Sequence, residues 1–229
     1  MTLFLVFLII VVVAGAVSYL IGQQRMRDIR AFAAAHGLTL MGNSWDLGDC
    51  GFALFSSGNR RYWRNVLRGQ WGGLPMTYCD YTYVVQAGRN SQTFAFSNAM
   101  TPLGMQIPWV TVAPMSALGE LAERSIGAPG IRFESLDFSD RFDVHAGDES
   151  FAVELIDAQM IETLLGFDHR CHVVFGPDYL MVFTHRLPVA EIGAILDATA
   201  AVSQRIPALV RARFGPQLPE PEQPPPPGG

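Results

Sequence analysis

The residues best suited to chemistry lie in one short stretch, FESLDFSDRFDV, at residues 133–144. This stretch places a carboxylate at every third position, at Glu134, Asp137, Asp140 and Asp143. Carboxylate oxygens are the ligands that Mg²⁺ and Ca²⁺ prefer in proteins. The spacing therefore raises the hypothesis of a metal site, or of an enzyme that uses an acidic cluster.

The period of a β-strand argues against that hypothesis. Side chains of a strand alternate between two faces, so Phe138, Phe142 and Val144 would share a face and point into a core. Asp137 and Asp143 would lie about 20 Å apart along an extended strand, too far to share one ion. We therefore expect a core strand here, with no catalytic residue, metal site or cofactor.

Composition narrows the functional class further. The chain has 229 residues, 49% of them hydrophobic, and a net charge of −5; it contains no lysine, so all 16 basic residues are arginine. An acidic average argues against a nucleic-acid binder, which normally has a basic face. The three cysteines, Cys50, Cys79 and Cys171, form no CxxC motif and suit a reducing compartment. No Walker A, GxGxxG, GxSxG or HExxH motif occurs.

The amino-terminal segment predicts a membrane anchor. Residues 3–22 carry no charged side chain, and a helix of this length spans about 30 Å, the thickness of the hydrocarbon core of a bilayer. We therefore expect a transmembrane helix over residues 1–23. The alternative is a signal peptide cleaved after the AGA of residues 14–16, which would release a secreted domain, although no basic residue precedes the apolar run.

The flanking charges predict the orientation of this anchor. Arg25, Arg27 and Arg30 follow the apolar segment, with Asp28 as the one acid among them. Positive flanks face the cytoplasm, so we expect a single-pass protein of the cell membrane with its N-terminus outside and its domain in the cytoplasm. The lipid bilayer is then the first partner, and these arginines are expected to contact anionic headgroups, at about 1 kcal/mol each.

Two further arginines join this expected lipid contact. Arg64 and Arg68 lie among aromatic residues in the segment 60–71 and would share one face of a regular strand. Arginines interleaved with aromatic residues also occur in proteins that bind single-stranded nucleic acid, but a membrane-tethered domain favours lipid. The plainer alternative is a solvated row of arginines above a buried aromatic row.

The rest of the chain predicts an α+β domain over residues 38–214, with one antiparallel sheet and a C-terminal packing helix. A linker helix over 24–37 should end at Gly37, and a Pro-rich tail over 215–229 should be disordered. Strands are expected near 38–41, 61–70, 76–86, 92–100 and 107–114, with a central hairpin over 170–186. Helices are expected over 116–124, over 149–156 after Asp148, over 158–165 after Asp157, and from Pro188 onward with an interruption at Pro207.

The second half of the chain also resembles a family of uncharacterised bacterial membrane-anchored domains. The pattern is an E-S pair, two phenylalanines, a valine, an aspartate, an alanine and a leucine-rich helix, matched by Glu134, Ser135, Phe138, Phe142, Val144, Asp148, Ala152, Leu155 and Leu164. Members often have a proline where this chain has Asp157-Ala158. The resemblance covers about the last third of the chain well and implies the identity of the domain, but no activity.

Together these features predict a membrane-tethered, cytosol-facing binding or scaffold domain of unknown ligand, without catalytic activity. A protein partner is possible, and nucleic acid is not expected. Two alternatives stay open: an enzyme with an acidic site, and an extracytoplasmic domain released by signal cleavage.

Overall fold

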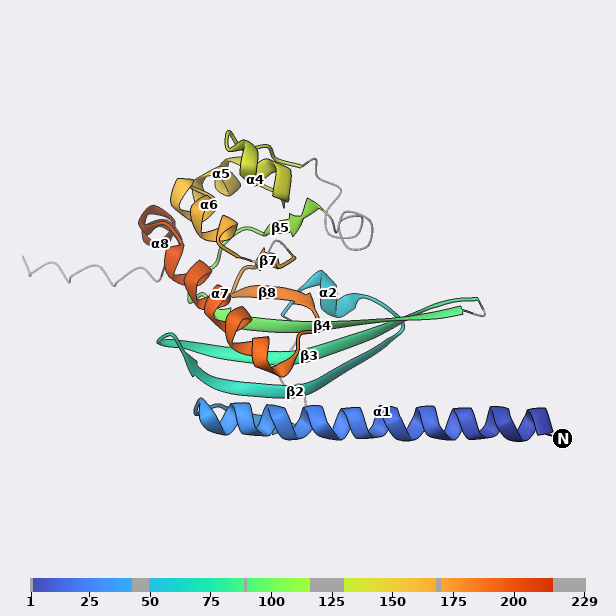
Figure 1. Ribbon diagram of the computed structural model, residues 1–229. Coiled ribbons are helices and arrows are strands. Elements are labelled where there is room, and N and C mark those ends of the chain that lie inside the picture. The colour runs from blue at the N-terminus through green and yellow to red at the C-terminus, as the bar shows by residue number, and fades with distance from the viewer. Residues whose placement is uncertain (1, 43–49, 89, 116–129, 168–169, 216–229) are drawn as a thin grey trace, which may run out of the picture.

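The computed structural model describes residues 2–42, 50–88, 90–115, 130–167 and 170–215. They form an antiparallel sheet in the order β1-β2-β3-β4-β8-β7-β5-β6, with helices on both faces (Figure 1). The predicted α+β class is confirmed. The strands are β1 (Thr39–Gly42), β2 (Arg60–Trp71), β3 (Leu74–Ala87), β4 (Asn90–Pro102), β5 (Val110–Pro114), β6 (Phe142–Ala146), β7 (His172–Phe175) and β8 (Tyr179–His185). The helices are α1 (Thr2–Ala35), α2 (Ala53–Ser56), α4 (Leu136–Arg141), α5 (Glu149–Leu155), α6 (Ala158–Leu165), the 3₁₀ helix η2 (Val189–Glu191), α7 (Ile192–Arg205) and α8 (Ala208–Phe214).

The β7–β8 hairpin lies in the interior of the sheet, between β4 and β5. Its side chains are apolar on both faces, and this pattern predicts a pair of strands that is covered on both sides. Alternate side chains of the hairpin feed two separate hydrophobic clusters, one on each face of the sheet.

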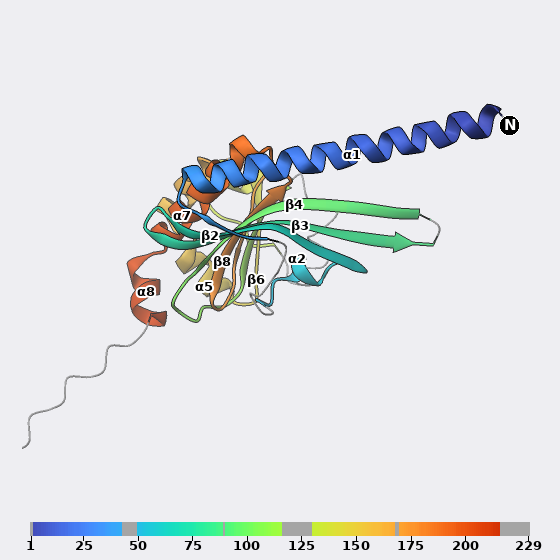
Figure 2. The ribbon, with the colours of Figure 1, turned by 90° about the horizontal axis from the view of Figure 1, so that it is seen from below.

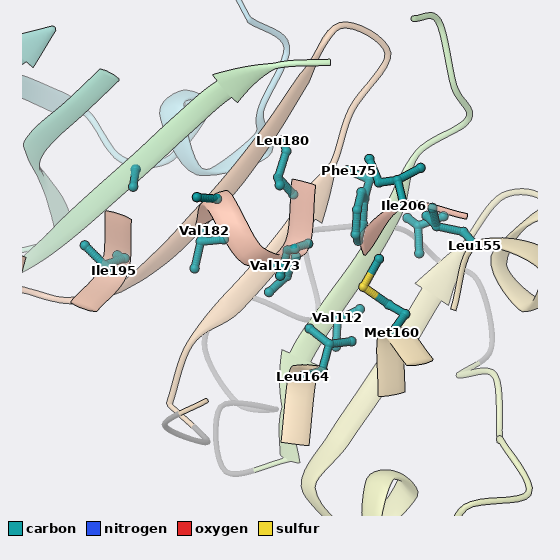
Figure 3. Packing of buried hydrophobic residues seen from close by; sticks show 14 of the residues in the cluster. Val112, Leu155, Met160, Leu164, Val173, Phe175, Leu180, Val182, Ile195 and Ile206 are labelled. Carbon is teal, nitrogen blue, oxygen red and sulfur yellow. The ribbon is translucent and has the colours of Figure 1, made fainter. Parts of the chain in front are cut away.

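The first cluster forms the main core, on the face that α7 covers, hereafter the α7 face. Val173, Phe175, Leu180 and Val182 of the hairpin meet side chains of α5, α6 and α7 there (Figure 3). All of these hairpin residues are almost completely buried. Burying each such side chain contributes about 1.5–3 kcal/mol. Because this cluster has many more buried hydrophobic residues than the second one among the described residues, it provides most of their hydrophobic stabilisation.

The second cluster lies on the opposite face, hereafter the α2 face, and is rich in aromatic residues. Tyr81, Phe96 and Phe183 project from the sheet, and Phe52 and Phe55 come from the α2 segment. The rings of Phe55 and Tyr81 meet edge to face, with centroids 5.0 Å apart. Among the described residues, the short helix α2 packs on this face, and a cavity lies beside it.

Helix α1 is continuous from Thr2 to Ala35 and ends where the sequence predicts. Gly37 adopts a φ of +67°, and the N–H of Leu38 donates to the carbonyl of Ala33 at 2.9 Å. Ile29 and Ala33 are buried in the main core. The N-terminal half of α1 extends past the body of the sheet, in the same direction as the β3–β4 hairpin (Figures 1 and 2).

Among the residues whose side chains the structure describes, no helix is long and apolar enough to span a membrane. The transmembrane helix predicted over residues 1–23 gains no support from this and stays a prediction.

Local capping signals in the second half of the chain are confirmed. The carboxylates of Asp148 and Asp157 accept the N–H groups of Phe151 and Met160, at 3.0 and 2.8 Å, and so begin α5 and α6. Pro207 separates α7 from α8, as its missing N–H requires.

The expected strand over the acidic stretch is wrong for its first part. The hydroxyl of Ser135 accepts the N–H of Phe138 at 3.4 Å and begins helix α4, so that only β6 is extended. Asp137 stands in the first turn of α4, where the helix dipole favours an acid. Asp140 is therefore an exposed residue of α4. The predicted helix over 116–124 and the tail from residue 216 onward lie outside the described residues.

The main core predicts a sharp contrast between two positions of α5. Leu155 is fully buried, whereas Val153 is 52% exposed. Replacing Leu155 with Ala should lower the free energy of unfolding by about 2–5 kcal/mol, because it leaves a cavity. The matched change Val153→Ala should alter it by about 0.5 kcal/mol or less. Denaturant unfolding of the two variants measures the difference, and equal effects would contradict this account of the core.

Candidate functional site

The most constrained polar group of the domain is the carboxylate of Asp80 on β3, which is 1% exposed. Arg25 of α1 donates to it through Nε and Nη2, at 2.8 and 2.7 Å. Asn65 Nδ2 and the Tyr78 hydroxyl donate to it as well, at 2.7 and 2.8 Å. A buried charge is tolerated when it is paired and hydrogen-bonded, and this one joins α1 to β2 and β3. We call these four residues the Asp80 clamp.

A relay of hydrogen bonds extends the clamp toward α7. Because the Tyr78 hydroxyl donates its one proton to Asp80, Ser97 must donate across the 2.9 Å contact to Tyr78. The N–H of Leu187 then donates to Ser97 Oγ at 3.0 Å, and the carbonyl of Leu187 accepts from Arg25 Nη1 at 2.8 Å. The clamp therefore fixes α1, β4 and the segment before α7 in one arrangement.

The electrostatics of the clamp favour its charged form. Burial alone would lower the pKa of Arg25, but the hydrogen bonds and the charge of Asp80 outweigh burial and raise it. Burial, followed by the charge of Asp80, raises the pKa of Tyr78 well above its ordinary value, so the hydroxyl stays a donor. The Arg25 guanidinium thus stays charged beside Asp80.

The clamp depends on a β-bulge in β2. Arg64 pairs with Asp80 and Leu67 with Tyr78, so three steps along β2 match two along β3. Asn65 occupies the bulge with a φ of +54°, a conformation that asparagine tolerates better than most residues. The bulge aims the Asn65 amide at Asp80.

Because of the same bulge, Arg64 and Arg68 do not share one face of β2, as a regular strand would require. Arg64 lies on the face of Asp80 and Tyr78, whereas Arg68 pairs with Thr77 and so lies on the opposite face. Arg64 is exposed and Arg68 is half-buried. The two therefore do not form one lipid-binding surface, because the extra residue reverses the alternation between them.

The arginines that follow the apolar segment, Arg25, Arg27 and Arg30, also differ in their surroundings. The Arg25 guanidinium is committed to Asp80 and Leu187, inside the domain. Arg27 and Arg30 are exposed on the same helix. Of these three residues, all among the five expected to contact anionic lipid, Arg25 therefore serves the fold, whereas Arg27 and Arg30 are exposed.

The acidic stretch does not converge in space. Asp137 and Asp140 are exposed on α4, while Asp143 lies on β6 with its Oδ2 2.7 Å from Nε2 of His145. Within the described ranges, no group of three or more His, Cys, Asp or Glu side chains is arranged to hold a metal ion.

A cavity of about 590 Å³ opens on the α2 face, over β5, β7 and β8. Such a volume lies in the usual range for small-molecule sites. Its lining is mainly aromatic and aliphatic, with Phe52, Leu54, Trp109, Val174, Met181 and Phe183. The sequence did not reveal it, because its wall joins residues that are far apart in the chain.

Trp109 forms part of the wall of this cavity. Its indole packs edge to face on Phe52, with centroids 5.5 Å apart. A Cβ placed on Gly176 would come within 2.9 Å of the indole, and one on Gly51 within 3.3 Å. Two glycines thus admit a side chain as large as tryptophan between the loops on either side.

Polar groups gather on one side of the cavity, on β5, β6 and β7. Thr111 and His145 face each other across the β5–β6 pair, and both line the cavity. His172 lines it too, stacked on Phe183 with a centroid distance of 4.4 Å and an interplanar angle of 5°. Burial, followed by the nearby charge of His185, lowers the pKa of His172 from 6.5 to about 4. His172 is therefore an uncharged imidazole at neutral pH.

The solved structure of the mycobacterial trehalose monomycolate transport factor A, TtfA, is similar to this chain. The match has a TM-score of 0.59 at 16% sequence identity, and it covers 85% of this chain and 97% of that one. The two chains share a fold. No family model and no curated protein matches the chain.

The clamp predicts a large effect of Asp80 on stability. Replacing Asp80 with Ala should lower the free energy of unfolding by about 3–5 kcal/mol, because the Arg25 charge loses its partner in a half-buried site. The matched control is Asp28→Ala on the exposed side of α1, which should change it by about 0.5 kcal/mol or less. Denaturant titration of the detergent-solubilised full chain makes the comparison, and equal effects of the two changes would refute the clamp.

The lowered pKa of His172 predicts that part of the folding stability is lost at acid pH. Its folded-state pKa is lowered, so the unfolded chain binds the proton more readily and stability falls as the pH drops from 6.5 toward 4. The gap corresponds to about 3 kcal/mol at roughly 1.4 kcal/mol per pKa unit. His172→Phe should remove that part of the loss, whereas His36→Gln, at an exposed position, should keep it. Unfolding free energies at pH 7 and pH 4 test this, and an unchanged profile for His172→Phe would count against it.

Proposed function

We propose that this protein is a membrane-tethered binding domain that faces the cytosol and performs no catalysis. The observation that carries the proposal is α1, one helix that begins in an uncharged segment and ends inside the folded domain. A flexible linker would let the domain drift from the bilayer, whereas a continuous helix held by the Asp80 clamp would keep it close.

The charges of α1 support the proposed direction. Residues 3–22 carry no charge, and Arg27 and Arg30 are exposed just after them. By the positive-inside rule these arginines favour the cytoplasmic side, where anionic headgroups would attract them. The resemblance to membrane-anchored domains agrees with this placement.

The absence of catalysis is proposed from the character of the cavity. Its lining is mainly apolar, and the carboxylates that the sequence offered for an acidic enzyme site lie apart. The similar solved structure is named as a transport factor, not as an enzyme, and that name is compatible with a binding role for this fold. A protein partner at the membrane remains part of the proposal, and its identity is open to crosslinking in native membranes.

The tether predicts the behaviour of the full chain in cells. It should sediment with membranes and resist extraction with alkaline carbonate, because about 20 apolar residues span a bilayer. The change Val12→Arg combined with Val13→Arg, at the middle of the segment 3–22, should release most of the protein into the supernatant, since an arginine at the bilayer centre costs about 2.5–3.5 kcal/mol. Immunoblotting of the two fractions measures the ratio.

The matched control is Arg27→Gln, which leaves the apolar segment intact and should stay in the membrane fraction. Protease added to intact spheroplasts tests the orientation, and the domain should be digested only after lysis. Carbonate extraction of the unaltered chain would overturn the tether. Digestion in intact spheroplasts would overturn the cytosolic orientation, and a mature N-terminus at residue 17 would establish the secreted alternative.

A further inference from the structure

We propose that the cavity on the α2 face binds the acyl chain of an uncharged, single-chain amphiphile, with its headgroup at the polar side of the cavity. The proposal rests on the proposed function, because it names the ligand class of a domain held at a membrane. The probe class is a long-chain ester of a neutral polyol, such as a monoacylglycerol.

The apolar part of the cavity fits an acyl chain in size and chemistry. Its floor is formed by Val174, Met181 and Phe183, each buried to at least nine-tenths, and Phe52 and Leu54 form a wall. Together they enclose part of a volume of about 590 Å³. Methionine and aromatic side chains adapt to flexible apolar ligands, and burying the ligand's methylene groups supplies about 0.8 kcal/mol each.

The polar side of the cavity selects the headgroup. Among the described lining residues there is no arginine, and the carboxylate of Asp148 lies at the edge. Asp143, paired with His145, adds a second acid beside it. An anionic headgroup would meet these acids with no compensating cation, so an uncharged group is favoured.

The same side offers hydrogen bonds to an uncharged head. Thr111 has a hydroxyl that donates and accepts, and the neutral imidazole of His172 does both through its two nitrogens. Thr111 and His172 line the cavity and are each more than nine-tenths buried. Hydroxyl or ester groups of a neutral head would satisfy these atoms, whereas an acyl chain alone would leave them facing hydrocarbon.

The tether supplies an argument for this occupant over a peptide. A domain held close to a bilayer meets amphiphiles at high local concentration, as a tethered site does for any ligand in the same compartment. Bulky rings of Phe52 and Trp109 line the cavity, and such rings pack well against a hydrocarbon chain.

Photo-crosslinking tests the proposal on the full chain reconstituted in phosphatidylcholine vesicles. The probe is a monoacylglycerol with a diazirine near the end of its acyl chain, and mass spectrometry maps the labelled peptides. Label is expected on peptides that contain Trp109 or Met181, and also on residues 3–22 from probe dissolved in the bilayer. A matching photoreactive fatty acid, which is anionic, should label the cavity peptides about tenfold less, a difference of about 1.4 kcal/mol.

Substitutions within the cavity provide the controls. Ala113 lines the cavity and is 4% exposed, so Ala113→Phe should fill the space and reduce cavity labelling at least about tenfold. Ala113→Ser changes the same position with little added volume and should keep the label. Val174→Phe is a second filling change from another strand, and thermal melts verify that each variant is folded.

The outcomes separate the cavity from the tether. Label on residues 3–22 with none on the cavity peptides overturns the cavity proposal and leaves the tether standing. Label on the cavity with none on residues 3–22 overturns the tether alone. If Ala113→Phe and Val174→Phe are both folded and still show full labelling of the cavity peptides, the assignment of the site is overturned. If the fatty acid labels these peptides as strongly as the monoacylglycerol does, the preference for an uncharged headgroup is overturned.

Discussion

The rest of the structure depends on one buried negative charge. Asp80 lies in the middle of a long aromatic strand, where an uncompensated carboxylate would be prohibitively costly. Three side chains donate hydrogen bonds to this carboxylate: Arg25 of α1, Asn65 of the β2 bulge and Tyr78 of its own strand. Removing any of them leaves polar atoms unsatisfied, so the charge enforces a single arrangement of helix and sheet.

The two faces of the sheet are packed differently. The α7 face is occupied by α1, α7 and the helices of the second half, and it provides the stable core. The α2 face has a short helix as part of its cover and retains a cavity bordered by Trp109. A sheet that is fully secured on one side can leave space on the other, which suits a binding domain better than a uniformly packed one.

Local signals were predictable from the sequence and long-range ones were not. The caps at Asp148 and Asp157 act within three residues, so their pattern is visible in the chain itself. Ser135 was missed because an alternating apolar pattern competed with its capping role. The bulge at Asn65 and the partner of Arg25 depend on Asp80, which is distant in sequence; the one visible signal was a lone acid in an aromatic strand.

The most direct test of the central claim is hydrogen exchange of α1 in the full chain reconstituted in lipid. The amides of residues 24–35 should exchange as slowly as those of β3, because the Asp80 clamp holds this part of the helix against the sheet. In Asp80→Ala they should exchange much faster while β7 and β8 stay protected. Rapid exchange of residues 24–35 in the unaltered protein, or equal protection in Asp80→Ala, would contradict the claim that this charge fixes the helix to the domain.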